Sequence, residues 1–378
     1  MQQIKPKKSL FKRVTKKIHL WLGFATTLPL LIISVTGIIL STLFLVKDVE
    51  KEFSHGEAFF SNKSEISRSV LQIVDFGKNY EIDGYKLAFI RFPEGESGEI
   101  TMRFLDSNRN SKQVIIEKTP NEALILHKIE NGTTFEKLIL KLHHTLLFEE
   151  TGEAIAGFVG IILCVMCISG LIIWLPKLPV QAFHLKNISV PKFSLKGRAL
   201  NVNLHKSFGI WLFAGLLIVA FTGTFLAFTK QFNQMVSSVS PVRDFKKTQV
   251  QHEQKQAANF QTLVQNVVES TGNRAIISIQ FPQKDEPYRF TIRPENHTQG
   301  RHGISVFIAG DGTVLEIRNP KDYSKGENFL MWLGMLHKGV GLGNAGIIWR
   351  IVQIFCGIGV ILFAYTGFMI WLRKPKKP

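Results

Sequence analysis

Four long stretches without charged residues constrain the fold more than any other feature. The runs 18–46, 154–176, 207–229 and 351–372 hold 29, 23, 23 and 22 residues and contain no Lys, Arg, Asp or Glu. A bilayer core of about 30 Å needs roughly 20 helical residues to cross it, and a helix satisfies its own backbone hydrogen bonds in lipid. The sequence therefore predicts an α-helical membrane protein with four transmembrane helices. The first run exceeds the apolar part of a signal peptide, about 7–15 residues, so we expect it to remain as an anchor.

The basic residues predict the orientation of these helices. Segments 1–17, 177–206 and 373–378 contain 7, 6 and 4 Lys or Arg residues and no Asp or Glu, which together equal the formal net charge of +17. Basic excess in short loops marks the cytoplasmic side. We therefore expect both termini and the loop 177–206 in the cytoplasm, and the long segments 47–150 and 230–350 outside. Because these charges flank membrane helices, they argue against nucleic-acid binding and for contact with anionic lipid in the bilayer.

One unit of sequence occurs twice in the chain, as a search for internal repeats shows. The matched segments are "HLWLGFATTLPLLIISVTG" at 19–37 with "HKSFGIWLFAGLLIVAFTG" at 205–223, "LHH" at 142–144 with "LHK" at 336–338, and "GLIIWLPK" at 170–177 with "GFMIWLRK" at 367–374. Their offsets are 186, 194 and 197, as expected for a duplication with a few insertions. The repeat predicts two parallel, pseudo-symmetric halves related by an axis along the membrane normal.

Each long segment outside the membrane has the pattern of an α+β module. Helical spacing of apolar residues predicts helices at 64–77 and 258–272. Alternating apolar residues predict strands at 85–92, 99–106 and 112–118 in the first module, and at 275–281, 288–294, 304–309 and 313–319 in the second. Both modules place Phe-Pro after the first strand, at 92–93 and 281–282. Each half is therefore predicted to contain a membrane helix, an external α+β module and a second membrane helix.

Four of the eleven histidines recur at equivalent places in the two halves. His19 and His205 lie at the predicted cytoplasmic ends of the first and third membrane helices, and His143 and His337 precede the second and fourth on the outer side. A pseudo-two-fold axis brings equivalent residues together, so we expect each pair to face one another. Two neutral imidazoles facing across a gap are what bis-histidine haem ligation requires, and helix bundles commonly hold cofactors this way. The sequence predicts two haem groups with these four histidines as the metal ligands.

Zinc is the rival metal, but four histidines split between opposite faces do not complete one tetrahedral site. Gly23 and Gly209 lie one helical turn beyond His19 and His205, on the same face, where they leave room for a flat porphyrin. We assign the Thr-Gly pairs at 36–37 and 222–223 to small-residue helix packing. Arg350, at the outer edge of the fourth helix, either pairs with a haem propionate or extends to the membrane surface.

The outer histidines lie well before the membrane helices that follow them. His143 and His337 precede their uncharged runs by 11 and 14 residues, which predicts that they lie on separate interfacial helices. The glycine-rich segment 339–346 is a candidate for one bend, and Thr151-Gly152 for the other. His144 adjoins His143; the alignment of "LHH" with "LHK" favours His143 as the ligand, and His144 remains the alternative.

The remaining histidines and the cysteines lack a paired counterpart. The unpaired histidines, which we expect to face solvent, are His55, His127, His184, His252, His297 and His302. The last two, in "ENHTQGRHG", offer an alternative site for an external ligand. All three cysteines (Cys164, Cys167 and Cys356) fall inside predicted membrane helices, where they lack the partly exposed, electropositive setting of a reactive thiol, so we interpret them as packing residues.

Several motifs in order make the chain resemble the PepSY-associated transmembrane family. They are "IHLWLGF" with its later "TG", "LHHTLLFEETGEAIAGFVG" with "SGLIIWLPK", "LHKSFGIW" with "FTG", and "TGFMIWLRK". The resemblance covers almost the whole chain and implies paired periplasmic PepSY-like modules. It also implies a multi-pass protein of the bacterial inner membrane, similar to ferric-siderophore reductases that carry b-type haem. Where many relatives have Arg after the first outer histidine, this chain has His144, which leaves the choice between the adjacent histidines open.

The resemblance further implies electron transfer from the cytoplasm to a periplasmic ferric siderophore, with release of ferrous iron. No Ser-His-Asp, HExxH or phosphate-binding glycine motif is present, and we assign no catalytic residue. The electron donor is expected to be a flavin reductase or membrane quinol. The alternative is a non-enzymatic membrane module that binds a peptide, a protease or a transport partner. A secondary transporter is less favoured because the predicted membrane helices contain no Asp or Glu.

Overall fold

The chain forms two compact units. The computed structural model describes residues 10–53, 63–80, 82–92, 99–108, 110–118, 124–131, 134–175, 190–243, 258–272, 274–283, 286–294, 303–342 and 345–373. The membrane unit comprises Met1–Val46, Leu138–Met235 and Leu330–Pro378, and the sheet unit comprises Lys47–Lys137 and Val236–Phe329. Each unit thus draws on both halves of the sequence repeat.

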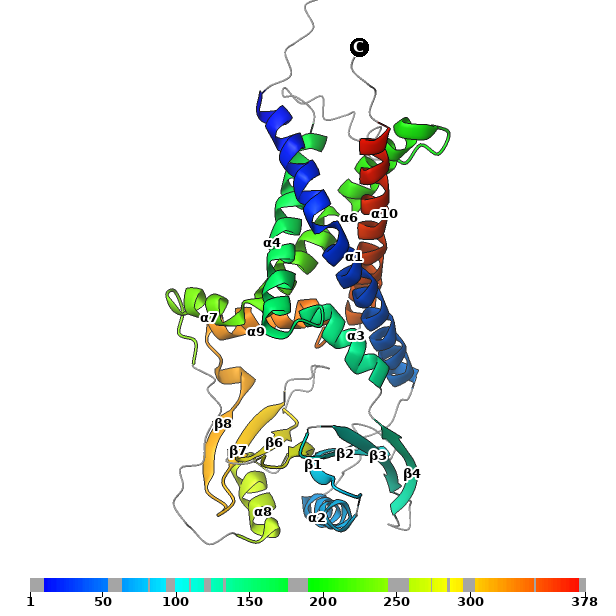
Figure 1. The fold of residues 1–378 in the computed structure, drawn as a ribbon. Helices are drawn as coiled ribbons and strands as arrows, with labels where there is room; N and C mark the ends of the chain where they lie inside the picture. Colours follow the sequence, from blue (N-terminus) through cyan, green and yellow to red (C-terminus); the bar gives the residue numbers. More distant parts are fainter. Residues whose placement is uncertain are drawn as a thin grey trace, which may run out of the picture. The chain divides into compact units, whose positions relative to one another are not determined.

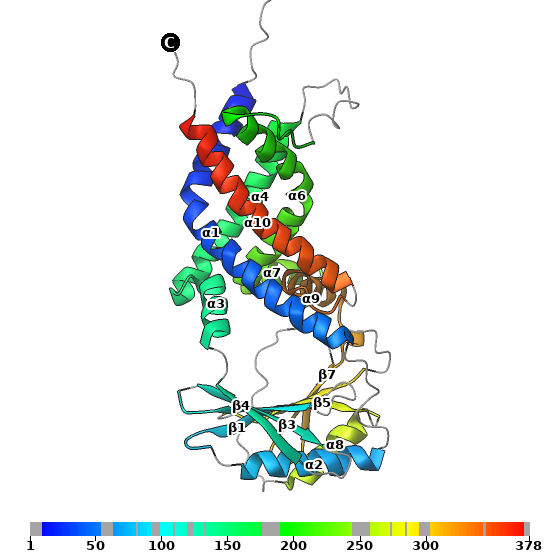
Figure 2. The same cartoon turned by 90° about the vertical axis from the view of Figure 1, so that its right-hand side faces the viewer.

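Four helices of the membrane unit are long and apolar enough to cross a bilayer (Figures 1 and 2). They are α1 (Leu10–Phe53), α4 (Glu149–Trp174), α6 (Gly197–Ala227) and α10 (Ala345–Leu372). The prediction of a helical membrane protein with four such helices is confirmed. All four helices begin before the corresponding uncharged run, because charged side chains are compatible with a helix; their absence marks the lipid boundary rather than the helix end.

Small residues bring the four helices close together. A Cβ added at Gly160 of α4 would lie 2.5 Å from Thr224 Oγ1 of α6, and one at Gly357 of α10 would lie 2.6 Å from Ile38 Cγ1 of α1. Such approaches are typical of helix contacts in lipid. A small apolar core lies between the helices and consists of Leu30, Val159, Leu216, Cys356 and Val360, with Cys167 packed against it. Two of the three cysteines therefore contribute packing surface, as predicted.

Two short helices carry the outer histidines. They are α3 (Thr134–Thr145) and α9 (Lys325–Lys338), and each precedes a spanning helix (Figure 1). The prediction that His143 and His337 lie on separate helices is confirmed. Between α3 and α4 the chain turns through left-handed backbone at Leu146 (φ 47°) and Leu147 (φ 68°).

The bend predicted at Thr151-Gly152 is wrong, because both residues lie inside α4. A Cβ added at Gly152 would lie 1.6 Å from the Thr145 carbonyl oxygen, so this glycine lets the first turn of α4 pass the end of α3. The second connection agrees better with the prediction. Gly339 and Gly341 have φ values of 61° and 72°, whereas residues 343–344 lie outside the described part of the chain.

The sheet unit contains one antiparallel sheet to which both halves of the repeat contribute. Its strands are β1 (Lys86–Arg91), β2 (Glu99–Leu105), β3 (Ser111–Lys118), β4 (Leu124–Asn131), β5 (Ile276–Gln280), β6 (Tyr288–Ile292), β7 (Ile304–Ile308) and β8 (Val314–Arg318). The order is β4-β3-β2-β1-β5-β6-β7-β8. Seven of these strands match the predicted ones. The fourth strand of the first module was missed because its pattern is irregular, and its pairing with β3 shifts register between Ile115 and Ile116.

The two modules join where β1 pairs with β5, with Ile90 opposite Ile279. The repeated phenylalanines complete this junction: Phe92 N donates to the Ile277 carbonyl at 2.9 Å, and Phe281 N donates to the Ala88 carbonyl at 3.0 Å. Pro93, which follows the first of them, lies outside the described residues. The modules predicted as separate elements of each half therefore share one continuous sheet.

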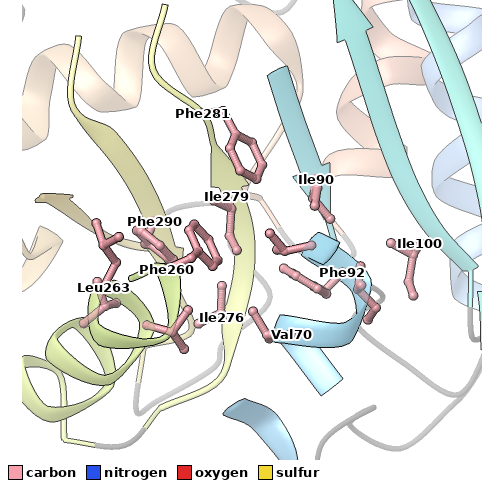
Figure 3. Close-up of a cluster of buried hydrophobic side chains, with 14 of the residues drawn as sticks. Val70, Ile90, Phe92, Ile100, Phe260, Leu263, Ile276, Ile279, Phe281 and Phe290 are labelled. Carbon is pink, nitrogen blue, oxygen red and sulfur yellow. The ribbon is translucent and has the colours of Figure 1, made fainter. Parts of the chain in front are cut away.

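Two amphipathic helices, α2 (Lys63–Asn79) and α8 (Phe260–Ser270), cover one face of this sheet (Figure 2). Their apolar sides and the strands form a core that crosses the β1–β5 junction (Figure 3). Val70, Ile90, Ile279 and Phe290 are completely buried, and each such side chain stabilises the fold by about 1.5–3 kcal/mol. The opposite face of the sheet carries neither helix.

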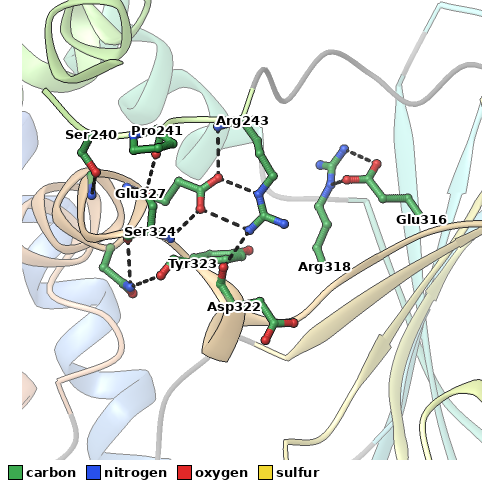
Figure 4. A network of polar contacts seen from close by, with 11 residues as sticks. Ser240, Pro241, Arg243, Glu316, Arg318, Asp322, Tyr323, Ser324 and Glu327 are labelled. Carbon is green, nitrogen blue, oxygen red and sulfur yellow. Dashed lines mark hydrogen bonds and ion pairs between the residues drawn. The ribbon is translucent and has the colours of Figure 1, made fainter. Parts of the chain in front are cut away.

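A network of polar contacts within the sheet unit fixes the start of α9 (Figure 4). Ser324 and Glu327 form a capping box: Glu327 N donates to Ser324 Oγ at 3.1 Å, and Ser324 N donates to Glu327 Oε2 at 2.8 Å. The Arg243 guanidinium donates to both carboxylate oxygens of Glu327, at 2.7 and 3.1 Å. Arg243 follows helix α7 (Thr229–Ser237) in the chain, and Glu327 follows the short 3-10 helix η2 (Pro320–Asp322). This bidentate pair therefore connects two segments that are far apart in the sequence.

Candidate functional site

The structure brings the four repeated histidines together in the two predicted pairs. The ring centroids of His19 and His205, the His19 pair, lie 6.4 Å apart with an interplanar angle of 77°. Those of His143 and His337, the His143 pair, lie 6.2 Å apart with an angle of 40°. Each pair therefore takes one ring from each half of the repeat.

These separations suit two imidazoles that bind one metal ion from opposite sides. A metal–imidazole bond is about 2 Å long, so two such rings have centroids roughly 6 Å apart. Within the described residues, no group of three or more His, Cys, Asp or Glu side chains is arranged to hold a metal ion. Two facing imidazoles thus suit an ion whose other ligands come from its own cofactor, such as the four nitrogens of a porphyrin.

A hydroxyl group on a neighbouring helix contacts Nδ1 of every one of these histidines. The four contacts are His19–Ser169 (2.8 Å), His205–Thr366 (2.8 Å), His143–Thr36 (3.1 Å) and His337–Thr222 (3.1 Å). In each case the hydroxyl itself donates to a carbonyl in the preceding turn of its own helix, at Met166, Leu362, Ile32 and Ile218 respectively.

This arrangement determines the tautomer of the four rings. A hydroxyl has one proton, and in all four cases a backbone carbonyl accepts it. The hydroxyl oxygen must then accept the Nδ1 proton of the histidine. Consequently each Nε2 keeps its lone pair, the form of imidazole that binds a metal, and a partner on the other nitrogen is the usual companion of a metal-bound histidine.

A glycine follows each of these hydroxyl residues and contacts the same ring. An added Cβ would meet the histidine Cε1 atom at Gly170 (3.4 Å from His19), Gly367 (3.8 Å from His205), Gly37 (3.2 Å from His143) and Gly223 (2.9 Å from His337). We call each Ser/Thr-Gly dipeptide a hydroxyl–glycine cradle. The packing assigned to 36–37 and 222–223 is therefore packing against the histidine rings of α3 and α9.

Every cradle comes from the same half of the repeat as its histidine. In the first half, α4 holds the ring of His19 on α1, and α1 holds the ring of His143 on α3. The facing ring comes from the other half in both pairs. His19 and Thr36 are 17 residues apart on α1, or about 25 Å of helix. The two pairs thus lie at levels separated by most of a bilayer core, about 30 Å.

The His143 pair has a second polar contact at Nδ1. His143 Nδ1 lies 3.0 Å from the Ile33 carbonyl oxygen, and His337 Nδ1 lies 3.2 Å from that of Val219. Burial, followed by the charges of His337 and His144, lowers the pKa of His143 to about 3. Burial likewise lowers the pKa of His337 to about 4. Both rings are therefore neutral at ordinary pH, as metal ligation requires.

The structure favours His143 over its neighbour as the ring that faces His337. His144 is exposed, and its ring centroid lies 6.0 Å from that of His143. The part of the ring that is turned inward is desolvated, and this, with the nearby charge of Lys338, lowers the pKa of His144 against an opposing effect of Glu153. His144 therefore borders the His143 pair without belonging to it.

The predicted glycines differ in their surroundings. Among the described residues, a Cβ added at Gly209 would meet no atom within 4 Å, so none of them fills the space beside this glycine, one turn from His205. At Gly23 it would meet only the terminal methyl group of Met166, at 3.2 Å. Because methionine side chains move readily, both positions are compatible with a flat group beside the His19 pair.

Arg350 is buried rather than extended to a membrane surface, with 1% of its area exposed. Its guanidinium donates to the Lys338 carbonyl at 3.1 Å and lies 5.2 Å from the Phe44 ring.

Two other side chains of α10 also bind carbonyls at the end of α9. Gln353 Nε2 donates to the His337 carbonyl at 2.6 Å, and Trp349 Nε1 donates to the Leu336 carbonyl at 2.5 Å. The first turns of α10 thus satisfy the carbonyls at the end of α9, which would otherwise lack partners. The hydrogen bond from Arg350 to the Lys338 carbonyl holds the end of α9 in place, a role that the sequence did not indicate.

A model of the family described as the PepSY-associated TM region matches residues 16–374. The chain belongs to this family. No curated protein matches the sequence significantly. The matched range of this PepSY-associated chain includes α1 from residue 16 onward, the other three spanning helices and the whole sheet, which agrees with the resemblance based on motifs.

Sequence reasoning missed two cradles and one tryptophan in this PepSY-associated chain. Ser169-Gly170 and Thr366-Gly367 immediately precede the repeated segments "LIIW" and "FMIW", so the recurring Ser/Thr-Gly dipeptide was a usable signal. Trp174 lies one turn beyond Gly170, and its indole N–H is buried without a hydrogen-bond partner among the described residues. The other unpaired histidines, apart from His127, lie outside the described residues, as does the side chain of His127.

Proposed function

We propose that the protein is a haem b electron-transfer protein of the bacterial inner membrane that reduces ferric-siderophore complexes on the periplasmic side. Electrons would come from a flavin reductase or from quinol, and ferrous iron would be released. One observation carries the proposal: two facing histidine pairs, in which hydroxyl–glycine cradles leave all four Nε2 atoms available as ligands. The family resemblance supports the same activity.

The residues present fit a haem at each pair. A bound haem would supply a one-electron carrier whose iron changes between the ferric and ferrous states. His19 and His205 would hold one group, and His143 and His337 the other. The cradle hydroxyls keep each Nδ1 proton in place, and the cradle glycines leave room for the rings. The indole N–H of Trp174, which has no hydrogen-bond partner among the described residues, is a donor suited to a carboxylate group of the cofactor.

The apolar interior between the two pairs serves the same activity. Charge crosses lipid at a high free-energy cost, so a chain that moves electrons must keep water and ions out of the bundle. The core around Leu216 and Val360 fills the space between the spanning helices. On the substrate side no acid–base group is needed, because ferric iron prefers hard oxygen ligands and ferrous iron binds them less firmly.

The proposal is tested with the full chain, purified after expression with an adequate haem supply. We expect two haem b per chain by quantitation, with split b-type bands in the reduced-minus-oxidised spectrum. The protein is then reduced with dithionite, and the excess dithionite is removed. Anaerobic addition of a ferric siderophore should reoxidise this protein. A colourless protein would remove the reductase and favour the alternative, a non-enzymatic binding module. If the reduced spectrum persists with several siderophore classes, the proposed substrate is wrong.

A further inference from the structure

The face of the sheet opposite α2 and α8 carries an unusual set of side chains. Strand register places them on neighbouring strands: Phe89 opposite Arg103, Arg91 opposite Thr101, Arg289 opposite Phe307, and Arg318 opposite Ser305. Side chains on these strands alternate between faces, and Ile90, Met102, Phe290 and Val306 point into the core under α2 and α8. We call Phe89, Arg91, Arg103, Arg289, Phe307 and Arg318 the arginine–phenylalanine face.

Aromatic rings support three of the four guanidinium groups. The Arg103 Cζ atom lies 5.5 Å from the Phe89 ring centroid. Those of Arg289 and Arg318 lie 5.6 and 4.4 Å from the Phe307 centroid. Cation–π contacts of this kind hold a guanidinium in one place while its N–H groups remain available to a second partner. The rings therefore preorganise the arginines on this face.

Two acidic residues with described side chains share this face by strand register, Glu99 on β2 and Glu316 on β8. Glu316 accepts two hydrogen bonds from Arg318, at 2.6 and 2.8 Å (Figure 4). In the part of the chain that the structure describes, no carboxylate lies within ion-pair distance of Arg91, Arg103 or Arg289. Burial, with a further effect of the neighbouring Arg318 charge, lowers the pKa of Arg289, as expected where positive groups are crowded. An anion bound on this face would relieve that repulsion.

We propose that the arginine–phenylalanine face binds the ferric substrate, and that it selects an anionic complex with aromatic iron ligands, of the catecholate type, over a neutral hydroxamate complex. This inference rests on the proposed function and adds the substrate class. Arginine recognises oxyanions through two parallel hydrogen bonds and stacks on aromatic rings. A neutral aliphatic complex offers neither interaction. Arg103 and Arg289 stand three strands apart, about 14 Å, so a bulky ligand can contact both.

Gallium complexes test binding without electron transfer, because Ga³⁺ has the charge of ferric iron and is not reduced. The full chain in detergent is titrated calorimetrically with an anionic gallium tris-catecholate and with a neutral gallium hydroxamate. We expect the anionic complex to bind more tightly. Arg103→Gln and Arg289→Gln should each weaken its binding about tenfold, as for loss of a charge-assisted hydrogen bond. Lys78→Gln, which removes one exposed charge from α2 on the opposite face, is the matched control and should leave binding unchanged.

Further variants distinguish failure of the binding face from failure of the proposed electron-transfer function. Arg289→Lys keeps the charge but not the planar group, and should recover only part of the affinity. Equal affinity for both complexes, or equal effects of Lys78→Gln and Arg103→Gln, would overturn the inference. So would arginine variants that change only the binding of anionic lipid vesicles. Haem-free protein that still binds the anionic complex would refute the electron-transfer function alone. Reoxidation by ferric complexes with unchanged arginine variants would refute the binding face alone.

Discussion

The His19 pair and the His143 pair use the same cradle on different supports. His19 and His205 belong to spanning helices; a hydroxyl contacts each Nδ1, and His19 has a further backbone hydrogen bond at Met166. The rings of the His143 pair come from short helices and also contact a backbone carbonyl. Their cradle glycines are closer to the rings, with added Cβ atoms at 3.2 and 2.9 Å against 3.4 and 3.8 Å. A hydroxyl and a glycine are therefore enough to orient each facing imidazole, whereas the helix that carries the imidazole can be a spanning helix or a short one.

The two halves also support the His143 pair differently. The helix of His143 ends in left-handed residues, Leu146 and Leu147, that lead directly into α4. The helix of His337 ends in a glycine turn, and Arg350 and Gln353 of α10 bind its last carbonyls. Equivalent ring positions are thus reached by a strained turn in one half and by side-chain hydrogen bonds in the other.

The largest expected effect is the loss of haem when one histidine of a pair is replaced, and it distinguishes the two pairs. His205→Ala and His337→Ala should each leave about half of the haem, because a single imidazole holds the group less well than two. The remaining ferric signals should differ in electron paramagnetic resonance. The nearly perpendicular rings of the His19 pair predict the larger g anisotropy, which His205→Ala should abolish.

Haem quantitation and the spectra of both variants provide the measurement, and His144→Ala is the control that should retain both groups. Loss of both haems from either single change would contradict two separable sites.

Glycine substitutions should affect the pairs unequally. Gly223→Ala brings a methyl group to 2.9 Å from His337 Cε1, whereas Gly367→Ala places one at 3.8 Å from His205 Cε1, an ordinary contact. Overpacking of this kind costs about 1–3 kcal/mol, so haem should leave the His143 pair roughly tenfold faster in Gly223→Ala. Haem transfer to an acceptor protein measures these rates. Similar rates for the two variants would show that the difference in spacing has no consequence.

Loss of a cradle hydroxyl should change a reduction potential rather than haem content. A hydrogen bond at Nδ1 raises the basicity of the ligand, which stabilises ferric iron, so Thr366→Val should raise the potential at the His19 pair. A bond of about 0.5–1.5 kcal/mol corresponds to roughly 20–60 mV. Thr222→Val should give a smaller shift because the Val219 carbonyl, 3.2 Å away, can still accept the proton. Potentiometric titration of both variants measures these changes in reduction potential. A larger change in Thr222→Val than in Thr366→Val would contradict the prediction.

Acidification should have the smallest effect on the His143 pair. The pKa values of His143 and His337, about 3 and 4, lie below the ordinary value of 6.5 because burial favours the neutral ring. Folding stability from the neutral rings is therefore complete above pH 6.5, and it falls progressively between pH 6.5 and these values because the unfolded chain takes up protons that the buried rings do not. The absorption bands assigned to this pair should not change between pH 8 and pH 5. A transition near pH 6.5 would show that the rings are open to solvent.

The features that the sequence revealed are those that repeat or that depend on composition. Uncharged runs were sufficient to predict the spanning helices, and the offset of His19 from His205 predicted the pairs. The cradles were missed because contacts such as His205–Thr366 join residues far apart in the chain. The β1–β5 junction and the contact of Arg350 with Lys338 also depend on tertiary packing. Periodicity within a segment carries no information on which other segment lies beside it.

Each facing pair is divided between the two halves, and this has a consequence for the origin of the protein. A half-length ancestor would have possessed one cradle and one ring of each pair, so it would have needed a second copy of itself to complete either site. Fusion of the two copies removes the dependence of that assembly on protein concentration. It also frees the halves to diverge, as the arginine at 350 and the adjacent histidines at 143 and 144 illustrate.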